Sequence, residues 1–285
     1  MTASSRKSSE NPDDRKRLSI SAPNVARMYD FYLRGKDNFQ ADREAALKVL
    51  AAAPEVPRAA LENREFLKRA LRFLIEEAGI RQFIDIGPGL PTQSNVHHIA
   101  QQLSPDCRVV YIDNDPVVVA HGRAHLANNN PNVIMIDGDL REPDHLLADP
   151  ALNQLIDTNK PVGLLLTLVL HFIPDEQDPS GVVAAYRDWL LPGSYLVISH
   201  VTSDGRAREV LSQVTDTYRQ ATAPLVMRSR TEVTKFFTGF DLASPGVVYL
   251  TQWRPILLEA SFSHPGNGGT RWAYAGMGRK LGGLA

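Results

Sequence analysis

Apolar runs and amphipathic stretches alternate along the middle of the chain, from about residue 81 to residue 201. Each short apolar run predicts a buried strand, and each stretch with helical periodicity predicts a helix. The runs lie at 81–87, 108–113, 132–138, 161–168 and 193–201, and the helical stretches at about 92–103, 116–128, 143–156 and 178–190. This alternation predicts βαβ units with right-handed crossovers, in a parallel sheet covered by helices on both faces.

The pattern before residue 81 is helical throughout. Helices are expected at 24–34, 41–53 and 57–79. Residues 1–20 are polar and charged with almost nothing to bury, which is typical of a disordered segment. We therefore expect three parts, namely a disordered tail at 1–20, an N-terminal helical cap at 21–80 and an α/β domain at 81–285.

The alternation weakens after residue 201. A polar amphipathic helix is expected at 204–221 and a shorter one at 230–240. Two strand-like pieces follow at 246–253 and 270–280, with the turn-rich SHPGNGG between them. This arrangement predicts an antiparallel hairpin at the end of the sheet.

Composition excludes several classes of protein. The formal net charge is −1, so no overall field attracts nucleic acid or anionic lipid. Cys107 is the single cysteine, which excludes an intramolecular disulfide and a cysteine-based zinc site. The N-terminus lacks the apolar core of a signal peptide, and the longest apolar run, 162–173, is shorter than the roughly 20 residues of a membrane span. We expect a cytoplasmic enzyme without a nucleic-acid or membrane partner.

The first strand ends in a short glycine loop, FIDIGPGLPT. Gly87 and Gly89 follow the strand, as in a dinucleotide-binding fingerprint, but Thr92 stands where the third glycine would be. The third glycine lets the next helix approach a pyrophosphate closely. Its replacement favours a nucleoside ligand that has no pyrophosphate.

Acidic residues also end the second and third strands. Asp113 ends the second strand, where a carboxylate can accept both ribose hydroxyls of a bound nucleoside. Asp115 directly precedes Pro116 and is expected to cap the next helix instead. Asp137 and Asp139 follow the third strand, where a carboxylate can accept the amino group of adenine. In open α/β sheets ligands bind at such strand ends.

These three acidic strand ends around a glycine loop resemble the class I methyltransferases that bind S-adenosylmethionine. The segments LLLTLVLHFIPDE and LLPGSYLVIS resemble the sequences after the fourth strand and at the fifth strand of that fold. The resemblance implies a Rossmann-like seven-stranded sheet, mostly parallel, whose last strand is antiparallel and lies beside strand five. It also implies S-adenosylmethionine as the cofactor.

Other segments resemble one bacterial family of S-adenosyl methyltransferases, common in actinomycetes, whose members mostly lack an assigned substrate. They are NVARMYDFYLRGKDNFQADREAA, NREFLKRALRFL, GIRQFIDIGPGLPTQSNVH, VVYIDNDPVV and YAGMGRK. The resemblance covers about residues 21–280. It departs at Pro88, where threonine is more usual, and at Arg34, where glycine is more usual.

The resemblance, together with fold position, implies a set of cofactor-binding residues. Asp85 would order the glycine loop, while Thr92 and Arg64 would bind the methionine carboxylate. Thr167, at the end of strand four, would face the methionine moiety, and Tyr29 would cover the cofactor from the N-terminal helices.

The adenosine end of the cofactor would take a second group. The backbone of Gly87 and Gly89 would approach the cofactor closely, with their loop under the methionine moiety. Asp113 would bind the ribose, Asn114 would flank the adenine, Asp139 would accept the adenine amine and Leu140 would pack on the ring. The full set of expected cofactor residues is Tyr29, Arg64, Asp85, Gly87, Gly89, Thr92, Asp113, Asn114, Asp139, Leu140 and Thr167.

A catalytic base is harder to assign. His171 follows strand four and His200 ends strand five, so both are candidates at the ligand edge of the sheet. His121 and His125 have a spacing that suits a metal, but no third ligand is evident, so no metal is expected. The expected reaction is methyl transfer to a small molecule. The sequence leaves open whether the chain forms a homodimer. Two alternatives are a non-catalytic S-adenosylmethionine-binding regulatory protein and an NAD(P)-dependent oxidoreductase.

Overall fold

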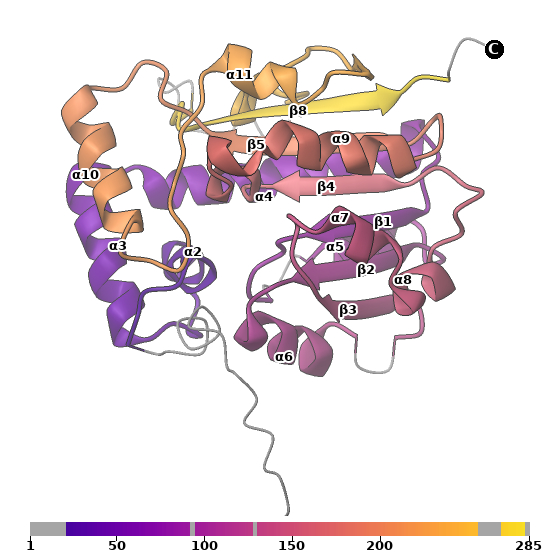
Figure 1. Cartoon of the computed structure of the whole chain (residues 1–285), viewed down its shortest axis with the longest axis horizontal. Helices are drawn as coiled ribbons and strands as arrows, with labels where there is room; N and C mark the ends of the chain where they lie inside the picture. The colour runs from indigo at the N-terminus through magenta and orange to yellow at the C-terminus, as the bar shows by residue number, and fades with distance from the viewer. Residues whose placement is uncertain (1–20, 92–94, 128–129, 256–268, 283–285) are drawn as a thin grey trace, which may run out of the picture.

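The computed structural model describes residues 21–91, 95–127, 130–255 and 269–282. A twisted sheet crosses the molecule with helices on both faces (Figure 1). The strands are β1 (Gln82–Ile86), β2 (Arg108–Asp113), β3 (Val133–Asp137), β4 (Gly163–Thr167), β5 (Tyr195–Val201), β6 (Phe240–Leu242), β7 (Val248–Tyr249) and β8 (Ala273–Lys280). The helices before residue 80 lie close to the expected ranges, whereas the helix expected at 143–156 is divided into two.

The order of strands is β3-β2-β1-β4-β5-β8-β6. Strands β1 to β5 are parallel to one another, and β8 lies antiparallel between β5 and β6. The order reverses between β1 and β4, so the carboxyl ends of these two strands form the switch point at which doubly wound folds bind ligands. The predicted sheet, with its antiparallel last strand beside strand five, is confirmed.

The α-helices are α2 (Val25–Tyr32), α3 (Gln40–Ala52), α4 (Val56–Arg72), α5 (Val96–Leu103), α6 (Pro116–His125), α7 (Pro143–Leu147), α8 (Pro150–Leu155), α9 (Pro179–Trp189), α10 (Arg208–Tyr218) and α11 (Arg230–Lys235). Helix α4 continues into a π-helical turn at Phe73–Glu77. The N-cap residue Asp115 accepts hydrogen bonds from the amides of Val117 and Val118, as predicted for that position.

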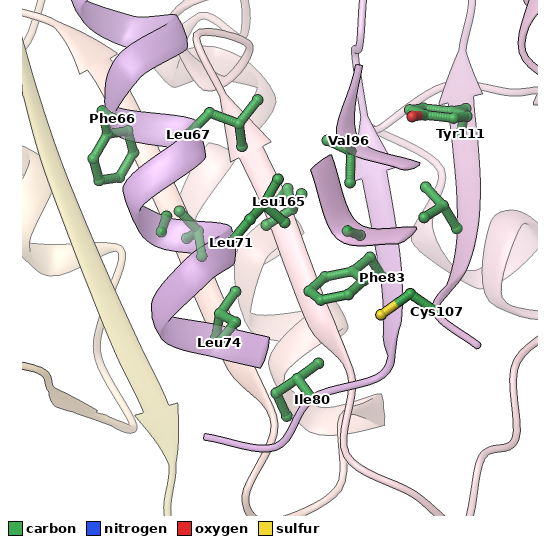
Figure 2. Close-up of a cluster of buried hydrophobic side chains, with 14 of the residues drawn as sticks. Phe66, Leu67, Leu71, Leu74, Ile80, Phe83, Val96, Cys107, Tyr111 and Leu165 are labelled. Atoms are coloured by element: carbon green, nitrogen blue, oxygen red, sulfur yellow. The ribbon is translucent and has the colours of Figure 1, made fainter. Parts of the chain in front are cut away.

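One face of the sheet is covered by α4, α5 and α6. Figure 2 shows Leu67 and Leu71 of α4, with Leu74 of the π-helical turn that follows, on the side of the strands that carry Phe83 and Leu165. Fully burying such a side chain contributes roughly 1.5–3 kcal/mol. This face therefore fixes the position of α4, and α4 in turn carries residues to the strand ends.

The opposite face is packed by α7, α8, α9 and α11. Successive strand residues alternate between the two cores, because side chains along a strand point to opposite faces. Phe83 belongs to the first core and Ile84 to the second, and Leu165 and Leu166 divide in the same way. Helices thus cover both faces of the sheet, so a ligand can reach it at the strand ends.

A third cluster of buried side chains lies beyond the two sheet cores. It is formed by α2, α3, the start of α4 and α10, with Trp272 just before β8. Figure 1 shows α2, α3 and α10 gathered at one end of the sheet, on the side toward which β4 points. The division into a tail, a cap and an α/β domain stays a prediction.

The chain between α10 and β8 departs from the expected pattern. The expected strand at 246–253 is reduced to Val248–Tyr249, followed by a 3₁₀ turn at Leu250–Gln252. Arg69 of α4 explains this, because it donates to the carbonyls of Leu250 (2.7 Å) and Trp253 (2.9 Å) in place of a strand partner. The part of the hairpin turn at 256–268 lies outside the described residues.

The helix expected at 230–240 is also shorter than predicted. Helix α11 ends at Lys235, Gly239 adopts a φ of 86°, and Phe240–Leu242 forms the edge strand β6 against β8. Within the described residues the sheet consequently has eight strands, seven in the main order and β7 paired with β8 off that path.

Candidate functional site

A cavity of about 330 Å³ opens at the carboxyl ends of the strands. Its volume is within the range of small-molecule sites. It brings together the following predicted site residues: Tyr29, Arg64, Asp85, Gly87, Gly89, Asp113, Asn114, Asp139, Leu140, Thr167 and His171. Thr92 lies outside the described residues, and His200 does not line this cavity.

The glycine loop between β1 and α5 needs both of its glycines. Gly87 and Gly89 have φ values of 73° and 68°, which side-chain-bearing residues rarely adopt. A Cβ atom at Gly87 would lie 2.5 Å from Cγ2 of Val169. The loop is held by hydrogen bonds from Gly87 N to Ile112 O (2.8 Å) and from Gly89 N to Asp113 Oδ2 (3.2 Å). Asp113 therefore holds this loop, and the expected role of Asp85 in ordering it stays a prediction.

Asp85 ends β1 as a buried carboxyl group in the cavity wall. Its Oδ1 atom has no hydrogen-bond partner among the described residues. Burial raises the pKa of this carboxyl to about 7, while Arg64 opposes the rise and Asp113 adds to it. A buried polar atom without a partner costs about 1–3 kcal/mol. The atom is therefore suited to a polar group of a ligand.

Asp113 ends β2 and is 8% exposed. Its Oδ1 accepts from the amide of Asp115 (3.0 Å), and its Oδ2 accepts from the amide of Gly89. Burial raises the pKa of Asp113 to about 7, against the lowering effect of these amides. Each carboxylate oxygen can accept a second hydrogen bond, so Asp113 keeps capacity for a diol.

Asp139, after β3, already has strong partners on its own side of the cavity. Arg141 donates from Nε to Oδ1 (2.8 Å) and from Nη2 to Oδ2 (2.5 Å), and Asn114 donates to Oδ2 (2.8 Å). Burial alone would raise the pKa of Asp139, but these donors outweigh it and hold the pKa at about 2. The carboxylate is thus fixed and ionised, with Asn114 beside it.

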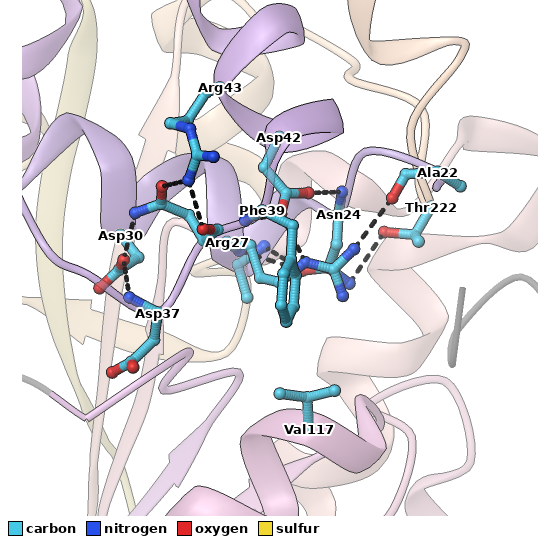
Figure 3. A network of polar contacts seen from close by, with 12 residues as sticks. Ala22, Asn24, Arg27, Asp30, Asp37, Phe39, Asp42, Arg43, Val117 and Thr222 are labelled. Atoms are coloured by element: carbon cyan, nitrogen blue, oxygen red, sulfur yellow. Dashed lines mark hydrogen bonds and ion pairs between the residues drawn. The ribbon is translucent and has the colours of Figure 1, made fainter. Parts of the chain in front are cut away.

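Helix α2 is tied to the rest of the molecule through its N-cap (Figure 3). The Asn24 side chain accepts from the amides of Ala26 and Arg27, and its Nδ2 donates to Asp115, the N-cap of α6. Arg27 pairs with Asp42 of α3 at 2.7 Å, and both side chains are almost fully buried. These contacts fix α2 and α3 over the strand ends.

A second hydrogen-bonded chain connects the helices with the sheet. Ser199 of β5 donates to Asn63 Oδ1 (2.6 Å), Asn63 donates to the Tyr29 hydroxyl (3.3 Å), and Tyr29 donates to Ala60 O (3.2 Å). Burial raises the pKa of Tyr29, so the phenol stays neutral. Tyr29 is therefore held in the cavity wall by α4.

The two histidine candidates have different surroundings. His171 lines the cavity, and its Nδ1 accepts from the Val201 amide at 3.5 Å. His200 is fully buried, donates from Nδ1 to Val201 O (2.7 Å) and accepts at Nε2 from Arg228 (3.0 Å). Burial lowers the pKa of His200 to about 3, and burial lowers that of His171 well below its ordinary value. The geometry argues against His200 as a base.

Several residues at or near the cavity were not expected from the sequence. Arg228 does not line the cavity but joins the segments after β4 and β5, because it donates to Leu170 O (3.3 Å), Ile173 O (2.8 Å) and Asp175. The missed cavity-lining side chains include Asn24, Tyr32, Asn63, Tyr218, Met227 and Trp272. Their spacing along the chain gives no local signal, since each reaches the site only through tertiary packing.

The described residues contain neither a metal-binding group of side chains nor a membrane-spanning helix. No group of three or more His, Cys, Asp or Glu side chains is placed to hold a metal ion there. No helix within the same ranges has both the length and the apolar character needed to cross a membrane.

The strand order, the glycine loop and the acidic strand ends define a doubly wound protein of the nucleoside-binding class. Residues 11–281 match the family model described as S-adenosyl methyltransferase. The chain therefore belongs to this methyltransferase family, and S-adenosylmethionine is its cofactor. A methyltransferase is an enzyme that transfers methyl groups. Membership of this family therefore argues against both the oxidoreductase and the non-catalytic alternative.

Two solved structures resemble the chain over nearly its full length. A candidate methyltransferase from Thermobifida fusca YX is 39% identical, with 93% of this chain and 97% of that chain covered and a TM-score of 0.84. A DUF574 family protein from Streptomyces avermitilis MA-4680 is 34% identical, with 92% and 100% covered and a TM-score of 0.85. A comparison with curated proteins gave no match.

Proposed function

We propose that the chain transfers a methyl group from S-adenosylmethionine to a small-molecule acceptor bound in the same cavity. The observation that supports this is the continuity of the cavity. It runs from the acidic strand ends of β1, β2 and β3 to apolar side chains of α2, α3 and α10. One end suits a polar nucleoside, and the other end suits an organic molecule that is largely covered by protein.

The residues of the polar end fit the cofactor. In this proposal Asp85 Oδ1, which has no hydrogen-bond partner in the described ranges, faces the ammonium group of the methionine moiety. Arg64 is close enough to lower the pKa of Asp85, so it is placed for the methionine carboxylate. Asp113 holds the ribose hydroxyls, as its remaining acceptor capacity permits.

Adenine is proposed to lie against Leu140, with Asn114 and Asp139 at its edge. The Asp139 carboxylate is ionised and is oriented by Arg141, so it is fixed before any ligand arrives. An acceptor that is fixed in advance loses little conformational entropy when it binds the adenine amine. Thr167 and Tyr29 complete the wall, and Thr92 stays a prediction.

The cofactor supplies an electrophilic methyl group on a positively charged sulfur. The chain contributes orientation and exclusion of water, which are the main requirements for an in-line displacement. With the cofactor held by Asp85, Asp113 and Asp139, the lone pair of the acceptor would form the new bond to carbon, and the sulfur would keep the pair of the broken bond. Burial lowers the pKa of His171 well below its ordinary value, which makes it a weak base, so we assign it a shaping role in the cavity and no proton transfer.

Calorimetric titration with S-adenosylhomocysteine tests the cofactor site. We expect Asp113→Asn to weaken binding at least tenfold, about 1.4 kcal/mol, because hydrogen bonds to a charged acceptor are the stronger kind. Asp137→Asn is the matched control, since Asp137 pairs with Asp113 in the sheet register but does not line the cavity. Absence of binding to the unmodified chain at millimolar ligand would refute the proposal.

The location in the cytoplasm, the lack of a nucleic-acid partner and the homodimer stay predictions from the sequence.

A further inference from the structure

We propose that the apolar end of the cavity binds a neutral aromatic acceptor with one hydrogen-bonding group, which the Tyr32 hydroxyl recognises. This inference rests on the proposed function, because it assigns the polar end to the cofactor. We call the apolar end the acceptor compartment. It is lined by Tyr32, Val49, Val56, Ala59, Phe172, Val214, Tyr218, Leu225, Met227 and Trp272.

The charges of the cavity wall are all outside the acceptor compartment. Among the described residues that line the cavity, the charged ones are Arg64, Asp85, Asp113, Asp115, Asp139 and Arg141. All of them belong to the strand ends or to the polar side of α4. A charged acceptor would lose its hydration in the compartment without gaining an opposite charge, which is strongly unfavourable. The compartment therefore selects neutral molecules.

Aromatic side chains give the compartment its shape. The rings of Phe172 and Tyr218 lie 6.1 Å apart at an angle of 35°. Tyr32 and Trp272 belong to the same buried cluster, in which α10 packs on α3. Aromatic rings prefer offset or edge contacts with other rings, and each such pair adds about 0.5–1.5 kcal/mol beyond its burial. A flat aromatic ligand makes the best use of these walls.

Tyr32 supplies the polar contact. Its side chain is 4% exposed, and its buried hydroxyl makes no hydrogen bond of ordinary geometry in the part of the chain that the structure describes. Burial, and after it the neighbouring Tyr218 hydroxyl, raise the pKa of Tyr32 well above its ordinary value, so the phenol is a neutral donor beside a second phenol. Two other polar groups of the wall are engaged, since Trp272 donates to Glu55 (3.3 Å) and Tyr29 donates to Ala60. The Tyr32 hydroxyl both donates and accepts, so it can pair with a hydroxyl or a carbonyl group.

Two small probes of equal size test the charge selectivity of the full-length protein saturated with S-adenosylhomocysteine. They are 2-naphthol, which is neutral at pH 7, and 2-naphthoate, which is anionic. Calorimetry should show saturable binding of 2-naphthol and at least tenfold weaker binding of 2-naphthoate. Equal affinity for the two probes, or no binding of 2-naphthol, would overturn the inference.

A variant tests the role of Tyr32. We expect Tyr32→Phe to lower the affinity for 2-naphthol at least threefold. The affinities for 2-methylnaphthalene and S-adenosylhomocysteine should stay unchanged. Tyr249→Phe is the matched control, because Tyr249 lies outside the cavity wall and pairs with Tyr274 (3.3 Å). An unchanged affinity for 2-naphthol in Tyr32→Phe refutes the assignment to Tyr32.

The proposed function and the proposed acceptor class can be refuted separately. If S-adenosylhomocysteine does not bind, the proposed function is wrong. If it binds and 2-naphthol does not, the cofactor site stands and only the acceptor class is wrong. The comparison of the two probes uses the unmodified chain, so it does not depend on the folding of a variant.

Discussion

A buried hydroxyl without a partner, as at Tyr32, should lower the stability of the folded chain. We expect Tyr32→Phe to increase the free energy of unfolding by about 1 kcal/mol, because the variant no longer buries an unsatisfied polar group. Urea denaturation in the absence of ligand measures this. The same change would then raise stability and weaken the binding of 2-naphthol, which is the signature of a residue kept for a ligand.

Tyr186→Phe is the control for this prediction. The Tyr186 hydroxyl is also buried, but it donates to Leu140 O at 3.0 Å. Its removal leaves a carbonyl without that donor, so we expect a loss of about 1 kcal/mol. A Tyr32→Phe variant that is destabilised as much as Tyr186→Phe would show that the Tyr32 hydroxyl has a partner in solution.

At the scale of elements, the end of α2 has an unusual residue in a glycine position. Arg34 has a φ of 61°, its amide bonds to Phe31 O (3.0 Å), and the Gly35 amide bonds to Asp30 O (2.8 Å). This is the Schellman pattern, in which glycine is preferred at the left-handed residue. We expect Arg34→Gly to stabilise the chain by about 0.5–1 kcal/mol in thermal or urea unfolding.

Arg34→Ala separates backbone conformation from side-chain loss. Alanine removes the guanidinium but keeps the Cβ atom, so we expect no comparable gain. Gly35 allows no such exchange, because a Cβ atom there would lie 1.8 Å from Asp30 Oδ1. Equal stabilisation by Arg34→Gly and Arg34→Ala would attribute the effect to the charge of Arg34 instead.

The elements also show what local patterns can predict. Strands β1 to β5 were predictable because each is an apolar run bounded by a helical stretch, and such runs fit only a sheet covered on both faces. Strand β6 was missed and the strand that contains β7 was predicted too long, since three and two residues are too few to show a period. Their geometry depends on β8 and Arg69, which are distant in sequence.

The same distinction holds for the site. Asp85, Asp113 and Asp139 were predictable as cavity residues, because the ends of parallel strands meet at one edge of the sheet. Tyr32 and Tyr218 could not be found in this way, since α2 and α10 meet only in the folded chain. The pairing of Asp139 with Arg141 depends on side-chain rotamers, which no sequence pattern specifies.

At the scale of the whole molecule, two buried carboxyl groups couple folding to protons. Burial raises the pKa of Asp85 and of Asp113 from 3.8 to about 7. Between these values the folded chain holds protons that the unfolded chain releases. The contribution of this pair to stability therefore decreases as the pH rises from about 4 to about 7, and it stays constant above that range.

Asp85→Asn should remove much of this dependence. We expect the variant to gain stability relative to the unmodified chain as the pH rises from 5 to 8, by about 1–3 kcal/mol, because the unmodified chain must bury more negative charge at higher pH. Urea denaturation at several pH values measures the difference. Asp137→Asn, on the exposed end of β3, is expected to follow the unmodified chain throughout.

The cofactor should reverse the preference of these carboxyl groups. An ammonium group beside Asp85 favours the ionised carboxylate, so binding of S-adenosylhomocysteine should release protons and become several-fold tighter between pH 6 and pH 8. Calorimetry in two buffers of different ionisation enthalpy counts the protons directly. Asp85→Asn should bind more weakly, with a flatter pH profile. Identical proton release in Asp85→Asn and the unmodified chain would place the ammonium group elsewhere and assign the coupling to Asp113.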